Sequence, residues 1–300
     1  MGPLLFNIDV NDLIYFIQNT EICNFADDNT IYSCGTNLDG IIIDLEEDLC
    51  QALEWFESNR LVANPSKFQM MLLGTKLNDK ICMEINGATV CPSASVKLLG
   101  ITIDAGLKFD QHIKTLCQKV NKNVKAFSRV ANLLDLDKAK LLYNSFLLSN
   151  FNYCPLIWIF CGKQCNKEIN RVHKRALRAL LGDYESTFEC LLTKNNEIAI
   201  HTKNLQKLMT EIYKSLNHES PSFMGEFFVQ RELTYDLRIK NTLQIPPTKT
   251  ISFGINSLAF RGSILWNTMP DTIKSAENVF RFKKGIKAWN GDKCSCNICK

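Results

Sequence analysis

Apolar side chains recur every three or four residues in several long stretches of the chain, a period that is typical of amphipathic helices. The clearest early stretch predicts a helix from about Leu38 to Asn59, with Ile42, Leu45, Leu49, Ala52, Leu53 and Phe56 on its apolar side. Later stretches predict helices over about 110–131, 137–148, 166–181 and 201–216, and Asp137 can cap the helix that it begins. The rear two thirds of the chain are therefore expected to be mostly helical.

Short runs of β-branched and aromatic residues predict strands in the first hundred residues. Two of these strands, at 22–25 and 30–33, flank Asp27, Asp28 and Asn29, which are residue types that favour turns. Further strands are expected at 68–73, 81–85, 89–90 and 96–103, and Asn86-Gly87 is a hairpin signal because both residues accept a positive φ. The pattern predicts an α+β fold, in which a β-hairpin, helices and a small antiparallel sheet precede a mostly helical region.

The acidic pair at the tip of the first predicted hairpin is the leading candidate for chemistry. Adjacent carboxylates repel each other, and a bound divalent cation relieves that repulsion. Asp27 and Asp28 are therefore candidate metal ligands. On these two residues alone, a solvated acidic turn is the more common outcome.

Several ordered motifs around this pair resemble the reverse transcriptase of non-LTR retrotransposons, the LINE-type and jockey-like elements. Phe25-Ala26-Asp27-Asp28 is similar to the polymerase catalytic hairpin, and Gly2-Pro3-Leu4-Leu5-Phe6 resembles the helix before it. Further likeness lies in Trp55 to Lys67, in Val96 to Asp104 and in Phe260-Arg261-Gly262-Ser263 with Trp266-Asn267. The resemblance covers nearly all 300 residues.

The resemblance implies an RNA-directed DNA polymerase that extends a DNA primer on an RNA template, with deoxynucleoside triphosphates and Mg²⁺. Asp27, and secondarily Asp28, would then hold Mg²⁺ as catalytic residues. Lys67 would lie near the triphosphate, where a lysine can protonate or neutralise the departing pyrophosphate. The alternative for Lys67 is an ordinary surface lysine after the Asn64-Pro65 turn.

The resemblance also implies an order of domains. Residues 1–77 would be a partial palm, 78–109 primer-grip-like antiparallel strands, 110–182 a helical thumb-like region, and 183–300 a helical C-terminal region with a basic and aromatic segment and a cysteine tail. In the family, fingers and a palm strand with another essential aspartate precede the motif that begins here at Gly2. Asp9 and Asp12 are expected on a helix flank and not opposite the hairpin tip, so we expect the isolated chain to be inactive.

Charge is distributed unevenly along the chain. Residues 1–100 hold 5 Lys and Arg against 14 Asp and Glu, whereas residues 101–300 hold 30 against 17. Two predicted helices carry rows of cations, Lys114, Lys122, Lys125 and Arg129 on one and Lys167, Arg171, Lys174 and Arg178 on the other. Such rows can follow the phosphates of a template–primer duplex, or they can be the solvated face of a helical array. A nucleic-acid-binding module without catalysis is therefore the alternative function.

The C-terminal tail carries Cys294, Cys296 and Cys299, three of the four ligands that a structural zinc site needs. A fourth would have to come from Cys161, Cys165 or a histidine. The 13 cysteines follow no regular framework, and no export signal or membrane-spanning stretch is visible. We therefore expect free thiols, a location in the nucleus or cytoplasm, and no membrane partner.

Overall fold

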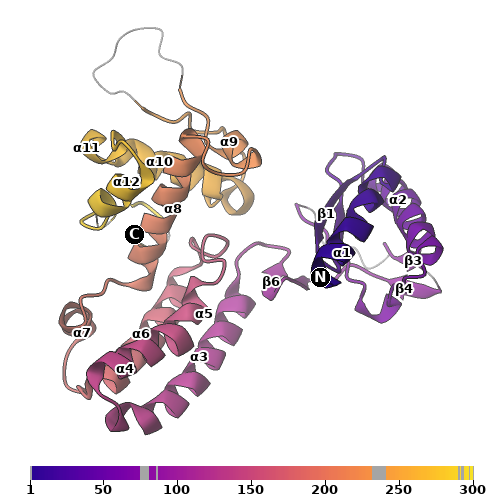
Figure 1. The fold of residues 1–300 in the computed structure, drawn as a ribbon. Coiled ribbons are helices and arrows are strands. Elements are labelled where there is room, and N and C mark those ends of the chain that lie inside the picture. The colour runs from indigo at the N-terminus through magenta and orange to yellow at the C-terminus, as the bar shows by residue number, and fades with distance from the viewer. Residues whose placement is uncertain are drawn as a thin grey trace. The chain divides into compact units, whose positions relative to one another are not determined.

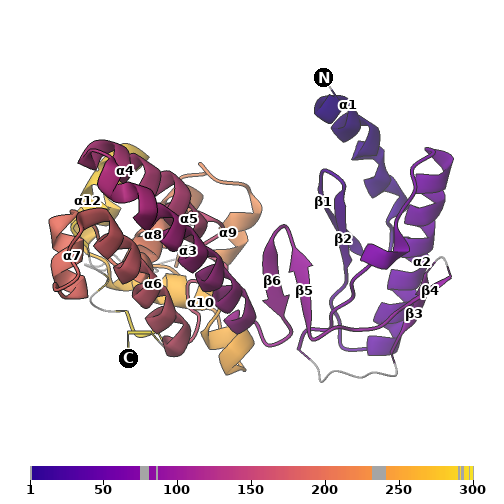
Figure 2. The same cartoon turned by 90° about the horizontal axis from the view of Figure 1, so that it is seen from below.

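The computed structural model describes residues 2–74, 81–85, 87–231, 241–289, 291, 294–296, 298 and 299. The chain forms two compact units, Met1–Ile101 and Thr102–Lys300, each of which is described by itself (Figures 1 and 2). Short hairpins early in the chain and helices after them make a mixed α+β fold, as the sequence predicts. The four-part division that the resemblance implies stays a prediction.

The first unit is built on one long helix and one hairpin. Its first six elements are α1 (Gly2–Asp9), η1 (Val10–Phe16), β1 (Glu21–Phe25), β2 (Asp28–Tyr32), α2 (Leu38–Ser58) and η2 (Pro65–Lys67). The periodic pattern predicted α2 to within a residue of its observed end. Val10 and Leu13 pack against Ala52 and Trp55 of α2, and apolar side chains of the hairpin cover this core.

The strand predicted at 68–73 does not form. Met70 makes only an isolated parallel bridge with Pro92, and the Met70 carbonyl accepts a hydrogen bond from the Ser93 N–H at 2.8 Å. Proline has no N–H to donate to a ladder, so pairing does not extend along the segment. The side chain of Gln69 instead bonds the backbone of Lys97.

The single strand predicted at 96–103 is a hairpin of two strands, β5 (Ser95–Leu98) and β6 (Ile101–Asp104). Leu99 and Gly100 between them have φ values of 46° and 83°. Positive φ at both central residues makes the chain reverse in a two-residue loop. The apolar run therefore contains a turn that its hydrophobicity conceals.

The neighbouring hairpin pairs β3 (Met83–Ile85) with β4 (Ala88–Val90) in antiparallel register. Asn86 lies outside the described residues, and Gly87 has the positive φ expected of the turn, 78°. Just beyond the strands a disulfide joins Cys82 to Cys91. The expectation of free thiols is therefore wrong for these two cysteines, because the register of the hairpin brings them together, and the other eleven are free.

The second unit begins with a helical bundle, in which Figure 1 shows α3 to α6 side by side. Its elements are α3 (Asp110–Val130), η3 (Ala131–Leu133), α4 (Leu136–Leu142), the π-helix η4 (Tyr143–Leu148), α5 (Ser149–Asn152) and α6 (Lys163–Leu181). The Cys165 thiol donates to Asp110, and Arg175 donates to Asn121. The first pair lies near the start of both helices, and the second pair lies about three turns later on both. Helices α3 and α6 therefore run parallel.

The cap of α4 differs from the prediction. Asp135 is the N-cap, and its side chain accepts the Lys138 N–H at 2.9 Å. Asp137, the predicted cap, lies inside the first turn. Asp135 is the N-cap because its backbone is extended, with φ −63° and ψ 159°, as an N-cap requires.

The rest of the second unit is helical and surrounds α8 (Ile200–Leu216). Its other elements are α7 (Phe188–Lys194), α9 (Phe223–Phe227), η5 (Ile251–Ile255), α10 (Leu258–Thr268), α11 (Asp271–Lys274) and α12 (Val279–Ile286). Phe282 stacks on Tyr213 and Trp266 in the core of this region. None of the described helices is long and apolar enough to cross a bilayer.

Candidate catalytic hairpin and nucleic-acid-binding helices

The β1–β2 hairpin presents the acidic tip, which we define as Asp27 and Asp28. The strands pair antiparallel with Phe25 opposite Asp28, so the loop consists of Ala26 and Asp27. The turn therefore lies one residue earlier than the predicted Asp27 to Asn29. Ala26 has φ 54°, a left-handed conformation that costs a residue with a Cβ about 1–2 kcal/mol.

Successive side chains of a strand point to opposite faces, and this alternation directs the acidic tip toward solvent. Ile22 and Ile31 are directly opposite each other and pack against the core of the first unit. Asp28 stands three positions before Ile31 on the same strand, so it points to the other face. Both acids of the tip are exposed, which leaves their carboxylates accessible to a metal ion.

A buried carboxylate that sequence reasoning missed holds the base of the hairpin. Asp48 of α2 is 1% exposed and accepts hydrogen bonds from the backbone N–H groups of Gln18, Asn19 and Thr20, at 3.1, 2.9 and 2.7 Å. The Thr20 hydroxyl also donates to it at 2.7 Å. Burial alone would raise the pKa of Asp48, but these hydrogen bonds outweigh burial and lower it. Figure 2 shows the hairpin beside α2.

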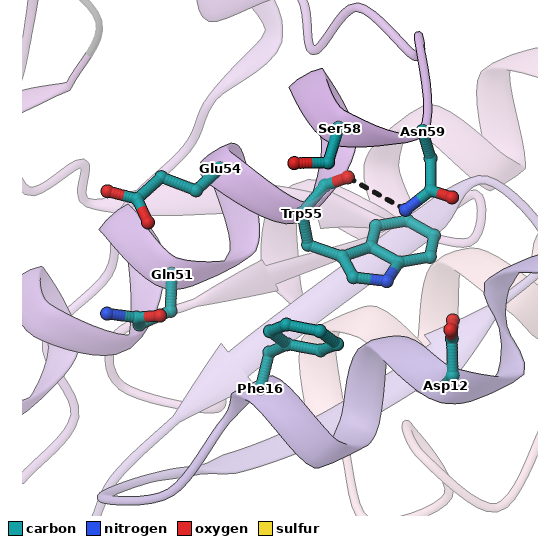
Figure 3. A pocket seen from close by; sticks show the side chains of 7 residues that line it. All are labelled: Asp12, Phe16, Gln51, Glu54, Trp55, Ser58 and Asn59. Carbon is teal, nitrogen blue, oxygen red and sulfur yellow. Dashed lines mark hydrogen bonds between the residues drawn. The ribbon is translucent and has the colours of Figure 1, made fainter.

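No third acid completes the tip in the part of the chain that the structure describes. There, one group of at least three metal-ligand side chains lies within mutual reach, and it does not contain Asp27 or Asp28. Asp12 instead lines a pocket between η1 and α2, beside Trp55, Ser58 and Asn59 (Figure 3). Asp27 lines a different depression, together with residues of α1.

Lys67 is exposed at the end of η2, in the turn that Asn64 caps by accepting the Ser66 N–H at 3.1 Å. It is not among the residues that line the depression beside Asp27. The turn was predicted from Asn64-Pro65. The catalytic role of Lys67 stays a prediction.

The four predicted cations of α3 are all exposed, and on α6 Lys167 and Arg171 are exposed while Lys174 and Arg178 are half-buried. The bundle brings part of the two rows together. On α3, Lys114 and Lys125 share a face with Asn121, at i, i+7 and i+11. On α6, Arg171 and Arg178 share a face with Arg175, whose side chain donates to Asn121 at 3.1 Å.

We define the basic seam as the face along this contact, with exposed Lys114, Lys125, Arg171 and Arg175 and half-buried Arg178. Arg175 was missed in the sequence because it falls outside the row of 167, 171, 174 and 178. Helix α3 carries five Lys or Arg against one acid, and α6 carries six against one. Since the boundary of the compact units falls at 101/102, the acidic and basic halves of the sequence coincide with the two units.

The cysteine tail also meets a residue from far away in the sequence. His201, the second residue of α8, lies beside Cys294, Cys296 and Cys299. Cys161 and Cys165, which the sequence left open as partners, are not members of this group. The contact joins His201 to Cys296 and Cys299, which lie 95 and 98 residues later in the sequence. No local sequence pattern could therefore indicate it.

Comparison with known proteins identifies the class of the first unit. Residues 1–103 match the family model for reverse transcriptase (RNA-dependent DNA polymerase). This part of the chain is therefore a reverse transcriptase segment. The chain has distant homology to RNA-directed DNA polymerases of the non-LTR retrotransposons jockey and R1, and this homology extends over more residues than the family model matches.

Two relatives carry that homology. The chain is 23% identical over 192 residues to the RNA-directed DNA polymerase from mobile element jockey of Drosophila melanogaster, a match that covers 61% of this chain and 21% of the relative. It is 24% identical over 168 residues to the retrovirus-related Pol polyprotein from type-1 retrotransposable element R1 2 of Nasonia vitripennis, covering 52% and 41%. The chain thus spans less than half the length of either relative. No solved structure matches it.

Proposed function

We propose that the chain is part of a retrotransposon RNA-directed DNA polymerase, in which the acidic tip binds Mg²⁺ during DNA synthesis on an RNA template. The observation that carries the proposal is the position of Asp27 and Asp28, adjacent and exposed at a two-residue hairpin loop inside a reverse transcriptase segment. Nucleotidyl transfer of this class uses two divalent ions to stabilise the attacking and leaving oxygens. Asp27 and Asp28 would hold them from one side.

We further propose that the chain does not extend a primer by itself. Two carboxylates supply one side of the metal site, and the described residues offer no third acid within reach of them. The opposing carboxylate would come from a palm strand and fingers that the family resemblance implies. Lys67 would neutralise the departing pyrophosphate in the assembled site.

The basic seam would hold the template–primer duplex through its phosphates. Its cations come from two parallel helices, so they form lines and not a single point of charge. Phosphate contacts of this kind fix position without reading sequence.

Primer extension tests the catalytic proposal. The 300-residue chain is assayed with an RNA template, a DNA primer, deoxynucleoside triphosphates and Mg²⁺, alone and mixed with the fingers and upstream palm of a related element. We expect extension only in the mixture, and a loss of at least about 100-fold with Asp27→Asn. Asp39→Asn, at an exposed acid in the first turn of α2, is the control and should have no effect. Extension by the chain alone, or full activity of Asp27→Asn in the mixture, would contradict the proposal.

The alternative, a nucleic-acid-binding module without catalysis, is favoured by the basic seam alone. It predicts duplex binding that weakens steeply with salt and is unchanged by Asp27→Asn. Arg171→Gln should reduce the salt dependence by about one unit in the slope of log K against log salt. Lys138→Gln is the control, because Lys138 lies on α4 and is already paired with Asp135 at 2.7 Å. Duplex binding without extension in the mixture would favour this alternative, and undetectable binding at low salt would exclude it.

A further inference from the structure

The C-terminal tail and the start of α8 bring four metal-ligand side chains together. Ligand atoms of His201, Cys294, Cys296 and Cys299 all lie within 4.8 Å of one another. The His201 Nε2 atom is 3.5 Å from the Cys296 sulfur and 3.4 Å from the Cys299 sulfur. His201, Cys294 and Cys296 are buried, whereas Cys299 is exposed.

These separations fit a tetrahedral zinc ion. Zinc binds thiolate sulfur at about 2.3 Å and imidazole nitrogen at about 2.0–2.1 Å, so a tetrahedron places nitrogen and sulfur about 3.6 Å apart. The same geometry places two sulfurs about 3.8 Å apart. The two nitrogen-to-sulfur distances, 3.5 and 3.4 Å, are close to the tetrahedral value, and every other separation is at most 4.8 Å. Small side-chain movements are therefore enough to close the cluster on the ion.

Contacts outside the cluster independently hold the tail against α8 and α10. The Arg261 guanidinium of α10 donates to the backbone oxygen of Ser295 at 3.0 Å and to its hydroxyl at 3.3 Å, between two of the cysteines. The Gln206 amide of α8 donates to the Trp289 carbonyl at 2.9 Å. Gly291, with φ 71°, lies so close to α8 that a Cβ there would be 2.8 Å from the Leu205 side chain. The ligands are therefore brought together by packing and do not depend on a flexible tail.

The charges around the cluster also suit a metal centre. Three thiolates, a neutral imidazole and Zn²⁺ carry a net charge of −1. Arg261 is 6% exposed, and no carboxylate among the described residues forms an ion pair with it. A buried cation needs a compensating charge, and an anionic zinc centre next to Ser295 would provide it.

We propose that His201, Cys294, Cys296 and Cys299 bind one structural Zn²⁺ that fastens the C-terminal tail to the first turn of α8. Soft thiolates with one imidazole select zinc among the common divalent ions. Four protein ligands leave no open position, so the site is structural and not catalytic. Zinc binding converts three thiols to thiolates and releases three protons to solvent, while the imidazole binds in its neutral form.

Metal analysis of the full chain tests the site. The purified protein should hold about one zinc per chain, and zinc added to the metal-free chain in weak buffer should release about three protons. His201→Asn and Cys296→Ser should lose bound zinc. His218→Asn and Cys190→Ser, matched changes at exposed positions, should keep it.

Exchange of the imidazole ligand for a fourth thiolate distinguishes loss of metal coordination from loss of folding. Replacing zinc with Co²⁺ should give thiolate-to-cobalt charge-transfer absorption, and His201→Cys should keep the metal while raising that absorption by about one third, from three thiolates to four. A folded chain without metal, a chain that holds iron instead of zinc, or zinc retained equally by His201→Asn would overturn the proposal. So would His201→Cys with no increase in charge-transfer absorption.

Discussion

Loss of the Asp48 carboxylate should disturb the base of the hairpin that carries the acidic tip. The substitution Asp48→Asn keeps the size of the side chain and one acceptor oxygen. That oxygen can retain the bonds now made by Oδ2, from Asn19 N–H and from the N–H and hydroxyl of Thr20. The amide nitrogen then replaces Oδ1 and faces the Gln18 N–H, which is another donor.

The cost follows from the hydrogen bonds that Asp48 accepts. A hydrogen bond to a charged group contributes about 1.5–3 kcal/mol, and a neutral one about 0.5–1.5 kcal/mol. The bond from the Gln18 N–H is lost, as is the long one that the Asn19 side-chain amide donates to Oδ1 at 3.5 Å, and the three bonds to Oδ2 become neutral. Allowing for their mutual dependence, we expect the free energy of local opening to fall by about 3 kcal/mol, which corresponds to about a 100-fold change in the opening equilibrium.

Amide hydrogen exchange measured by mass spectrometry follows this opening directly, in peptides that cover 17–32. Exchange at Gln18, Asn19 and Thr20 should become about 100-fold faster in Asp48→Asn. The matched control is Asp44→Asn, one turn earlier on α2.

The lowered pKa of Asp48 means that its contribution to stability is present above the pKa of an unfolded aspartate and is lost as the pH falls through the pKa of the folded state. The difference between wild type and variant should therefore shrink below about pH 4. Unchanged exchange at these three amides, or an equal effect of Asp44→Asn, would refute the reasoning.

Two further changes test other parts of the structure. Ala26→Gly should relieve the left-handed strain at φ 54° and, after the added freedom of the unfolded chain, slow exchange of the hairpin amides about threefold; faster exchange would contradict the assigned turn. Burial, and secondarily Glu168, raises the pKa of the Cys117 thiol to about 12, so iodoacetamide at pH 8 should modify exposed Cys190 and leave Cys117 unmodified. Equal modification of the two thiols would show that α3 does not bury Cys117.

The long helices could be predicted from the sequence because they repeat one pattern over many turns. Helices α2, α3 and α6 span 21, 21 and 19 residues, and each has an apolar side of helical period. The segment at 68–73 is short and apolar, which is where helix, strand and loop have the same hydrophobic pattern. Its structure depends on Pro92, a partner that blocks the ladder.

The position of the first turn was missed for a different reason. Asp and Asn are the better turn formers, yet the pairing of Ile22 with Ile31 fixes the register and moves the loop to Ala26. Burial of one apolar pair therefore outweighs the preference of single residues. The hairpin that carries the acidic pair could be predicted because its strands and turn lie close together in the sequence, and the metal-binding role of the pair stays a prediction.

The other missed features depend on contacts between distant parts of the chain. Asp48 gave a signal that could have been noticed, since it shares the apolar side of α2 with Leu45, Leu49 and Ala52. A charged residue in such a row indicates a buried acceptor with specific donors. His201 gave no comparable signal, because only the packing of α8 against α10 and α12 shows that it lies beside the tail.

The wide turn at Tyr143–Leu148 also determines how the bundle tolerates changes in length. From Ala139 the buried side chains follow at positions 143, 147 and 151. Steps of four residues drift about 40° each around an α-helix, so an unbroken α-helix would turn Phe151 away from its neighbours. The π geometry absorbs the excess, and Asn150 and Asn123 donate to the Phe146 carbonyl within it. Deleting one residue there would leave eleven residue steps between Ala139 and Phe151, which an ordinary α-helix completes within about 20° of three full turns. Phe151 would then stay on the face of Ala139, so we expect the bundle to tolerate this deletion and an ordinary α-helix to replace the π-helix.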